Sequence, residues 1–245
     1  MAPEPPGTPG TPESPGTPEP PGTPGGSAAP RAQGAVLDAG FFAAWVEEAA
    51  RSVLAGKDRL TRLDTAIGDG DHGTNLDRGL TAAVQALADH RPATPGALLV
   101  LVGGTLIRRV GGASGPLYGT AFREAGRALG EEPGVSPGAL AGALEAAVDG
   151  VRRLGSAAEG DKTMVDALAP AVRALAQAVR EGRDVREALD TAAAAARGGA
   201  EATVPMQARK GRASYLGPRS IGHEDPGAAS AALLVEALRT VAARW

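Results

Sequence analysis

From Val36 to the C-terminus, apolar residues recur every three or four positions, which is the period of an amphipathic α-helix. Only 3% of the residues are aromatic, so the core must be built mainly of alanine, leucine and valine. Small and straight-chain residues favour closely packed helices over sheets, in which β-branched and aromatic residues predominate. No stretch alternates with the two-residue period of a strand, and we therefore predict an all-α fold.

Cap signals place several helix starts. Thr94-Pro95, Ser136-Pro137 and Asp225-Pro226 each put an N-cap residue before a proline at the first helical position. Together with the apolar period, they predict eight helices, which span about 41–63, 74–88, 95–110, 116–129, 136–154, 164–181, 184–203 and 226–241. Glycine-rich and polar loops lie between them, and such loops often carry function. These loops are 67–73, 111–115, 155–163 and 209–227.

Residues 1–34 differ in composition from the rest of the chain. Gly-Thr-Pro occurs four times there, and the segment holds 11 of the 20 prolines. Proline removes backbone donors and glycine raises the entropic cost of ordering, while few apolar residues offset either effect. We predict a disordered Pro/Gly-rich tail over 1–34 and one folded domain over 35–245, which is long enough for a well-buried core.

Charge and composition exclude several classes of protein. The formal net charge is −3 and the basic residues are dispersed, so the chain lacks the basic surface typical of nucleic-acid binding. The absence of cysteine excludes disulfides, thiolate metal sites and thiol nucleophiles. No apolar run approaches the roughly 20 residues of a membrane span, and the N-terminus lacks the basic and apolar regions of a secretory signal. We therefore expect a cytoplasmic protein with no membrane or nucleic-acid partner.

A cluster of carboxylates marks the segment that follows the first predicted helix. Asp64, Asp69 and Asp71 lie within eight residues, around glycines at 68, 70 and 73. Like charges so close together repel, and clustering them costs stability unless a cation joins them. Carboxylate oxygens on a flexible turn suit Mg²⁺, which takes its other ligands from water and substrate phosphates. The residues alone leave an alternative open, an exposed acidic turn with local capping.

Three well-known motifs are similar to parts of this chain and are rejected. Residues 68–73 fit G-x-G-x-x-G, but a dinucleotide-binding fingerprint follows a buried strand, and none is predicted here. The same stretch lacks the glutamate at the twelfth position of an EF-hand loop. From Gly155 to Thr163 the pattern nearly matches a P-loop, but Asp161 separates the second glycine from Lys162 and no strand precedes it.

Five motifs follow one another in the chain: Asp64-x4-Asp69-Gly-Asp71-His-Gly-x-Asn75, Gly112-Ala-Ser-Gly-Pro-Leu-Tyr-Gly119, Gly160-Asp-Lys-Thr-Met164, Arg209-Lys-Gly-Arg-Ala-Ser-Tyr-Leu-Gly217 and His223-x-Asp-Pro-Gly227. In content and order they resemble the ADP-binding L subunit of dihydroxyacetone kinase, over essentially all of 36–245. The resemblance implies a barrel of eight antiparallel helices, with the nucleotide held by connecting loops at one end.

The resemblance also implies roles for particular residues. Asp64, Asp69 and Asp71 would ligate two Mg²⁺ ions that bridge the phosphates of ADP or ATP. Arg212 would complete the phosphate site, for which its planar donor fork is suited. The rest of the nucleotide site would comprise His72, Gly73, Thr74, Asn75, Ala113, Ser114, Gly155, Met164, Asp225, Pro226 and Gly227. Lys162 receives no role.

Four of these residues have other interpretations when each is taken alone. His72 could be merely structural, and we assign it no catalytic role. Ser114 fits a helix cap, and Met164 fits an ordinary core position. Arg212 fits a solvated basic patch with Arg209 and Lys210. The residues themselves leave these alternatives open.

The implied activity is phosphoryl transfer to dihydroxyacetone, a reaction that needs positioning and charge neutralisation more than covalent work by the protein. The implied partners are a separate K subunit that holds dihydroxyacetone and an M-type phosphocarrier subunit that rephosphorylates bound ADP. The residues leave open whether free ATP is the phosphoryl donor instead, and whether the chain forms a homodimer. The alternative functions are the nucleotide-binding domain of a fatty-acid-kinase-like system and a regulatory nucleotide-sensing subunit.

Overall fold

The computed structural model describes residues 1–5, 7, 10 and 36–245. The chain divides into two units, residues 1–33 and 34–245, and every helix and strand that is described lies in the second. The predicted disordered tail, 1–34, lies outside the described residues apart from 1–5, 7 and 10, so it stays a prediction.

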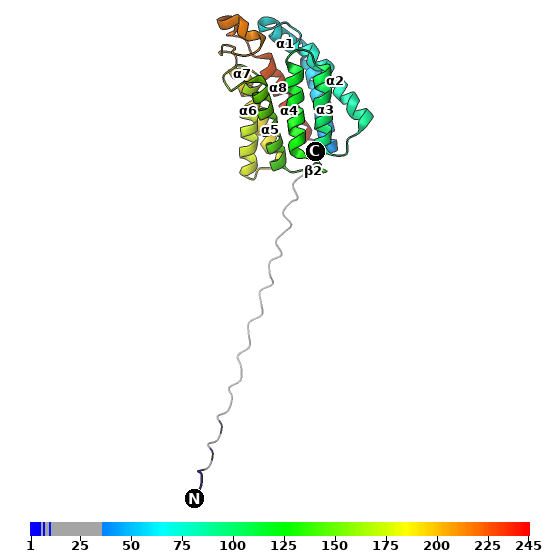
Figure 1. The fold of residues 1–245 in the computed structure, drawn as a ribbon. Coiled ribbons are helices and arrows are strands. Elements are labelled where there is room, and N and C mark those ends of the chain that lie inside the picture. Colours follow the sequence, from blue (N-terminus) through cyan, green and yellow to red (C-terminus); the bar gives the residue numbers. More distant parts are fainter. Residues whose placement is uncertain (6, 8–9, 11–35) are drawn as a thin grey trace. The chain divides into compact units, whose positions relative to one another are not determined.

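The second unit is a closed ring of α-helices. Consecutive helices pack against each other around the ring, and the last helix packs against the first (Figure 1). The helices described in 36–245 are α1 (Ala39–Ile67), α2 (His72–His90), α3 (Pro95–Arg109), α4 (Ser114–Leu129), α5 (Pro137–Gly155), α6 (Val165–Arg180), α7 (Val185–Ala202), the 3₁₀ helix η1 (Arg212–Ser220) and α8 (Pro226–Ala242). The predicted all-α barrel of antiparallel helices is therefore confirmed.

The predicted cap-and-proline signals begin three of these helices. The side-chain oxygens of Thr94, Ser136 and Asp225 accept hydrogen bonds from the backbone N–H three residues on, at 3.3, 3.2 and 2.8 Å. The α-helix bounds lie within two residues of the predicted ones, except at the end of α1. That helix continues to Ile67 and so includes Asp64 in its last turn. The cap chemistry therefore places the helix starts correctly.

Two kinds of element differ from the prediction. A pair of two-residue strands, β1 (Leu37–Asp38) and β2 (Gly134–Val135), is antiparallel, and β2 lies at the opposite end of the ring from η1 (Figure 1). Strands this short cannot show a two-residue apolar period, so the sequence pattern misses them. The helix η1 forms inside segment 209–227, where only a loop is predicted. Its nine residues include a proline and a left-handed glycine at 217, which hide a helical period.

Apolar side chains fill the inside of the ring. Phe41 and Phe42 are fully buried, and the Trp45 ring stacks on Phe122 with centroids 5.3 Å apart. The indole N–H of Trp45 donates a hydrogen bond to the backbone oxygen of Leu234 at 2.9 Å, which connects α1 to α8.

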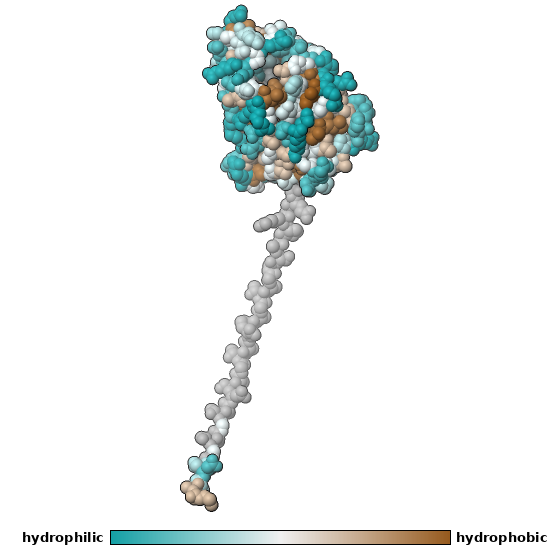
Figure 2. Space-filling model, in the orientation of Figure 1, coloured by the Kyte–Doolittle hydropathy of each residue, from teal (hydrophilic) through white to brown (hydrophobic). Residues whose placement is uncertain are grey.

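The outer face drawn in Figure 2 is largely hydrophilic with smaller apolar patches. None of the described helices combines the length and hydropathy that a membrane span requires.

Helices α3 and α4 approach each other closely because glycines face each other at their contact. These glycines recur at a spacing of seven, Gly96 and Gly103 on α3 and Gly119 and Gly126 on α4. A Cβ atom on Gly119 would lie 2.3 Å from the Ile107 side chain and 2.7 Å from the backbone oxygen of Gly103. The two backbones therefore leave no room for a larger side chain.

We expect Gly119→Val to lower the free energy of unfolding by about 3 kcal/mol, because the added side chain forces the two helices apart. Gly142→Ala in α5 is the matched control, since a Cβ atom there meets nothing within 4 Å. This control should raise the free energy of unfolding by about 0.5–1 kcal/mol, as alanine favours an exposed helix position. Urea unfolding followed by circular dichroism measures both changes, and equal effects would contradict the close packing.

Candidate active site

Three carboxylates meet at the end of α1. Asp64 lies in the last turn of that helix, and Asp69 and Asp71 lie in the short loop that leads to α2. One oxygen atom of each carboxylate lies within 4.8 Å of an oxygen of the other two. Asp64 is buried, whereas Asp69 and Asp71 are exposed. The structure therefore brings together the three residues that the sequence singles out.

Local hydrogen bonds hold the Asp64 carboxylate in place. Its Oδ2 atom accepts hydrogen bonds from the backbone N–H of Asp71 at 2.9 Å and of His72 at 3.1 Å. These bonds put a negative charge at the N-terminus of α2, the favourable end of the helix dipole. A Cβ atom on Gly68 would lie 2.0 Å from Oδ1 of Asp64, so glycine is required at this turn. Capping uses Oδ2 and leaves Oδ1 for a cation.

The donor set fits a divalent cation. Among the described residues, the carboxylates have one cationic partner, Arg212, whose guanidinium lies 3.1 Å from Oδ2 of Asp69. Both side chains of this ion pair are substantially exposed, at 68% and 35%, so the pair contributes little to stability. Three clustered carboxylates supply the hard oxygen ligands that Mg²⁺ prefers. The site residues themselves are therefore suited to Mg²⁺.

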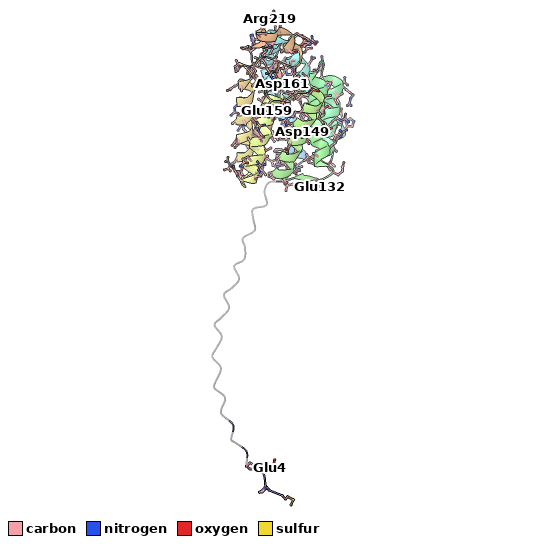
Figure 3. All side chains as sticks on the ribbon, turned by 60° about the vertical axis from the view of Figure 1, so that its left-hand side comes forward. Glu4, Glu132, Asp149, Glu159, Asp161 and Arg219 are labelled. Carbon is pink, nitrogen blue, oxygen red and sulfur yellow. The ribbon has the colours of Figure 1, made fainter. Side chains whose placement is uncertain are left out.

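A cavity of about 490 Å³ lies beside the carboxylates, within the range of about 300–1,000 Å³ typical of small-molecule sites. Loops at one end of the ring line it, together with the adjoining turns of the helices that these loops connect. Figure 3 shows Arg219 of η1 and Asp161 of the α5–α6 loop toward this end, and Glu132 at the other. The predicted site residues that line the cavity are Asp64, Asp69, Asp71, His72, Ala113, Ser114, Gly155, Met164, Arg212, Asp225, Pro226 and Gly227.

Three predicted site residues, Gly73, Thr74 and Asn75, do not line the cavity and lie in the first turn of α2. Gly73 faces α1, where a Cβ atom would lie 2.3 Å from a backbone oxygen. Asn75 is buried and packs against Gly111, at the start of the loop that leads to Ala113. Direct nucleotide contact by these three residues stays a prediction.

His72 joins three helices through hydrogen bonds. Its Nδ1 atom lies 3.0 Å from the hydroxyl of Ser114 in α4, and its Nε2 atom lies 2.8 Å from the hydroxyl of Ser230 in α8. Burial lowers the pKa of His72, so the ring is neutral at neutral pH. The Ser114 hydroxyl bonds to His72, and the N-cap of α4 is Ala113, so the alternative of Ser114 as a helix cap is wrong.

Sequence reasoning misses three residues of this region. Ser230 lies in an alanine-rich helix without any motif, yet its hydroxyl lies 2.6 Å from that of Tyr118 and bonds to His72. Tyr118 lies in the Gly112–Gly119 motif, and its place in that motif is the one feature of the sequence that points to a role in the site. Lys210 also lines the cavity beside Arg212, whereas the sequence places it only in a possible basic patch with Arg209 and Arg212.

Lys162 is 1% exposed, although lysine is seldom fully buried. Its ammonium donates hydrogen bonds to the backbone oxygens of Thr203 at 2.8 Å, of Met206 at 3.1 Å and of His223. An ammonium has three hydrogens, and all three are thereby used. The Lys162 ammonium is therefore not free for a phosphate, which agrees with the rejection of a P-loop.

Asp225 should make stability depend on pH. Burial raises its pKa to about 7, against the opposing effects of the Ala228 N–H and of Lys162. Between its usual pKa near 4 and about 7, the folded state holds a proton that the unfolded state has lost. The contribution of Asp225 to the free energy of unfolding therefore falls as the pH rises through this range, by up to about 1.4 kcal/mol per pH unit. Above about pH 7 this contribution is constant.

The variant Asp225→Asn keeps a good cap residue and removes the titration. We expect the wild-type free energy of unfolding, minus that of the variant, to fall from pH 5 to pH 7 and to level off above about pH 7. Urea unfolding at each pH measures this difference. His72, whose pKa is lowered, contributes an opposite pH dependence to both proteins, so its effect cancels in the subtraction. A difference that stays constant from pH 5 to pH 7 would contradict the raised pKa of Asp225.

Comparisons with known proteins agree with this geometry. Residues 66–240 match the family model described as the DAK2 domain. The chain is 41% identical over 198 residues to the ADP-binding subunit of the PEP-dependent dihydroxyacetone kinase of Escherichia coli strain K12, which covers 81% of this chain and 94% of that subunit. It is 37% identical over 199 residues to the ADP-binding subunit of the PTS-dependent dihydroxyacetone kinase of Lactococcus lactis, covering 81% and 95%.

The fold is also found in a solved kinase. The dihydroxyacetone kinase of C. freundii, solved in complex with AMP-PNP and Mg²⁺, matches with a TM-score of 0.65 and 26% identity. The match covers 87% of this chain and 36% of that one, so this chain spans about a third of the solved chain. With the family model and both ADP-binding relatives in agreement, the chain belongs to the DAK2 domain family and is a phosphotransferase subunit of the dihydroxyacetone kinase type.

Proposed function

We propose that residues 35–245 bind ADP or ATP with Mg²⁺ in the cavity and deliver a phosphoryl group to dihydroxyacetone held by a separate K subunit. The observation that carries this proposal is the meeting of three carboxylates, within 4.8 Å of one another, at the wall of a 490 Å³ cavity that Arg212 also lines. The names of the two ADP-binding relatives and the AMP-PNP and Mg²⁺ complex of the C. freundii enzyme support it.

Asp64, Asp69 and Asp71 hold two Mg²⁺ ions in this proposal. When bound, the ions neutralise charge on the phosphate oxygens. Arg212 reaches the same region, since its guanidinium already lies 3.1 Å from Asp69. Its donor fork can move from that carboxylate to a phosphate oxygen at little cost, because the existing ion pair is exposed.

The start of α4 offers a phosphate site. Ala113 and Ser114 begin this helix, and no side chain caps its first N–H groups. Uncapped N–H groups at a helix N-terminus favour an anion, both through hydrogen bonds and through the helix dipole. Gly112, which also lines the cavity, precedes them with a φ of 64°, a left-handed conformation that suits glycine.

Apolar residues on the cavity wall suit a purine base. Gly155 and Met164 line the cavity, and Val151, Leu154 and Leu117 contribute further apolar surface. Met164 is also 5% exposed and belongs to the hydrophobic core. It is therefore both a core residue and part of the cavity wall. A flexible thioether side chain packs well against a flat ring.

The names of the relatives also bear on the phosphoryl donor. Both relatives are named for dependence on PEP or on the PTS, which supports a phosphocarrier of the M type that recharges bound ADP. In this scheme the nucleotide stays on the subunit and acts as a cofactor. An L-erythrulose 1-kinase of Mycolicibacterium smegmatis, 40% identical over 181 residues, makes a four-carbon ketose a second acceptor to test.

Mass spectrometry of the gently purified protein tests the proposal first, and we expect ADP to co-purify in a ratio near one. Phosphoryl transfer is then measured with a K subunit, with dihydroxyacetone or erythrulose as acceptor and with either ATP or a PEP-driven phosphocarrier as donor. Activity with the phosphocarrier and not with ATP supports the complete scheme. If no nucleotide co-purifies and none binds in the presence of Mg²⁺, the proposal fails, and transfer to a ketose excludes a purely regulatory role.

A further inference from the structure

Lys162 stands outside every role described so far. It is 1% exposed, and its backbone has a φ of 62°, a left-handed conformation that is unfavourable for a residue with a side chain. The turn that carries it is held by Asp166, which accepts hydrogen bonds from the N–H of Gly160 at 2.5 Å and of Thr163 at 2.7 Å. A strained lysine on a fixed turn indicates that the position of its ammonium matters.

The acceptors of the Lys162 ammonium come from both ends of one loop. Thr203 and Met206 lie where α7 ends, and His223 lies just before α8, about 20 residues further along. We call residues 203–225 the clasp loop. One cation therefore joins the two ends of the clasp loop to the α5–α6 turn.

Other hydrogen bonds close the clasp loop at the same place. The N–H of Gly222 donates to the backbone oxygen of Val204 at 2.8 Å, and the N–H of Asp225 donates to the Thr203 hydroxyl at 2.9 Å. The N–H of Arg209 donates to the backbone oxygen of Asp161, next to Lys162, at 3.1 Å. The ends of the loop are thus bonded to each other and to the turn that carries the lysine.

The clasp loop carries part of the cavity wall. Lys210, Gly211 and Arg212 line the cavity from η1 and its approach, and the loop ends directly in the Asp225-Pro226-Gly227 turn, which lines it too. The α5–α6 turn contributes Thr163 and Met164 to the same cavity. A single buried ammonium therefore lies where three parts of the wall join.

We infer that Lys162 is a positioning residue, whose ammonium closes the clasp loop and thereby holds Arg212 and the Asp225–Gly227 turn in place for the nucleotide. The three acceptors of the ammonium are neutral backbone oxygens, so its binding brings no further carboxylate to a site that already has three. Three short bonds from one cation also restrict both loop ends at once, which no neutral side chain of this length achieves. The inference rests on the proposed nucleotide site.

The variant Lys162→Met tests it, with Lys57→Met as the matched control. Both substitutions remove one ammonium, but Lys57 is partly exposed, and its ion-pair partner among the described residues is Asp77 on α2, at 3.3 Å. We expect the Kd for ADP with Mg²⁺, measured by calorimetry, to rise on the order of 10- to 100-fold in Lys162→Met and to stay unchanged in the control. In the Arg212→Met background, Lys162→Met should raise the Kd by a smaller factor, because the residue it positions is already gone.

Hydrogen exchange of the nucleotide-free protein gives a second readout. We expect the amides of Ala208, Gly222 and Asp225 to exchange faster in Lys162→Met than in wild type, while amides in α1 to α4 are unchanged. A merely structural role would lower protection throughout the ring, and would give additive effects with Arg212→Met. If Lys162→Met does not fold, Lys162→Gln, which keeps two donors, is measured in the same way.

Unchanged exchange in the clasp loop would overturn the inference, as would faster exchange with an unchanged Kd. Additive effects of Lys162→Met and Arg212→Met on the Kd would also overturn it. If the wild type binds no ADP at all, the proposed function fails instead, and the exchange data still report whether Lys162 closes the loop. The two failures are thereby distinguishable.

Discussion

Asp71→Asn should weaken Mg²⁺-dependent ADP binding by more than about 100-fold, because even residues that only support metal ligands cost 10- to 100-fold when changed. The substitution removes one of three carboxylates within 4.8 Å and keeps the volume of the side chain. Asp71 is exposed and gives α2 no side-chain cap bond, so helicity should be preserved. Calorimetry with ADP, in Mg²⁺ and in EDTA, measures the effect.

The matched control for this experiment is Asp77→Asn. It makes the same chemical change on the same helix, but Asp77 pairs with Lys57 and does not line the cavity. We expect its Kd for ADP to equal that of the wild type within about twofold, since Asp77 lies outside the cavity and a partly exposed ion pair contributes little. Unchanged ADP binding by Asp71→Asn would contradict the metal site, as would equal losses in both variants.

Arg212→Met should lower kcat for phosphoryl transfer on the order of 100- to 1,000-fold, because loss of one donor aimed at developing charge has effects of this size. The guanidinium is the cationic group nearest the carboxylate cluster, 3.1 Å from Asp69. Methionine keeps a long side chain without charge or donors. Because Arg212 is 68% exposed, the free energy of unfolding should change by less than about 0.5 kcal/mol.

Arg209→Met provides the control for Arg212, since Arg209 lies in the same loop, is exposed and does not line the cavity. Its activity should stay within about twofold of the wild type, as expected for a surface residue. Steady-state kinetics with a K subunit and dihydroxyacetone compare the two variants. A similar kcat in Arg212→Met and wild type would exclude Arg212 from the transfer step.

The helices were predictable because their signals are local. Thr94, Ser136 and Asp225 each bond within one turn of their own helix, so neighbouring residues contain the information. The β1–β2 pair was not predictable, because Leu37 and Val135 are far apart in the chain and each strand has only two residues. The same applies to η1, because the loop that contains it is closed at its base by bonds from Lys162 to Thr203 and His223, which lie 41 and 61 residues away in the chain.

Part of the site follows from the sequence for the same reason. Asp64, Asp69 and Asp71 lie within eight residues, so a single turn must bring their carboxylates together. The bonds of His72 to Ser114 and Ser230 span 42 and 158 residues, and no local pattern announces them. In the sequence, Lys162 belongs to a segment that nearly matches a P-loop. Only the folded structure shows that its ammonium is buried and bonded to backbone oxygens far away in the chain.

By itself, the sequence determined the class of fold, the helix starts and the acidic turn, because apolar period, capping and charge clustering are properties of residues near one another in the chain. The tertiary structure alone decided which loops share the cavity, why His72 is neutral and where the Lys162 ammonium goes. Those features depend on burial and on partners brought together by closure of the ring, where α8 packs against α1. Burial and long-range partners exist only once the chain has folded.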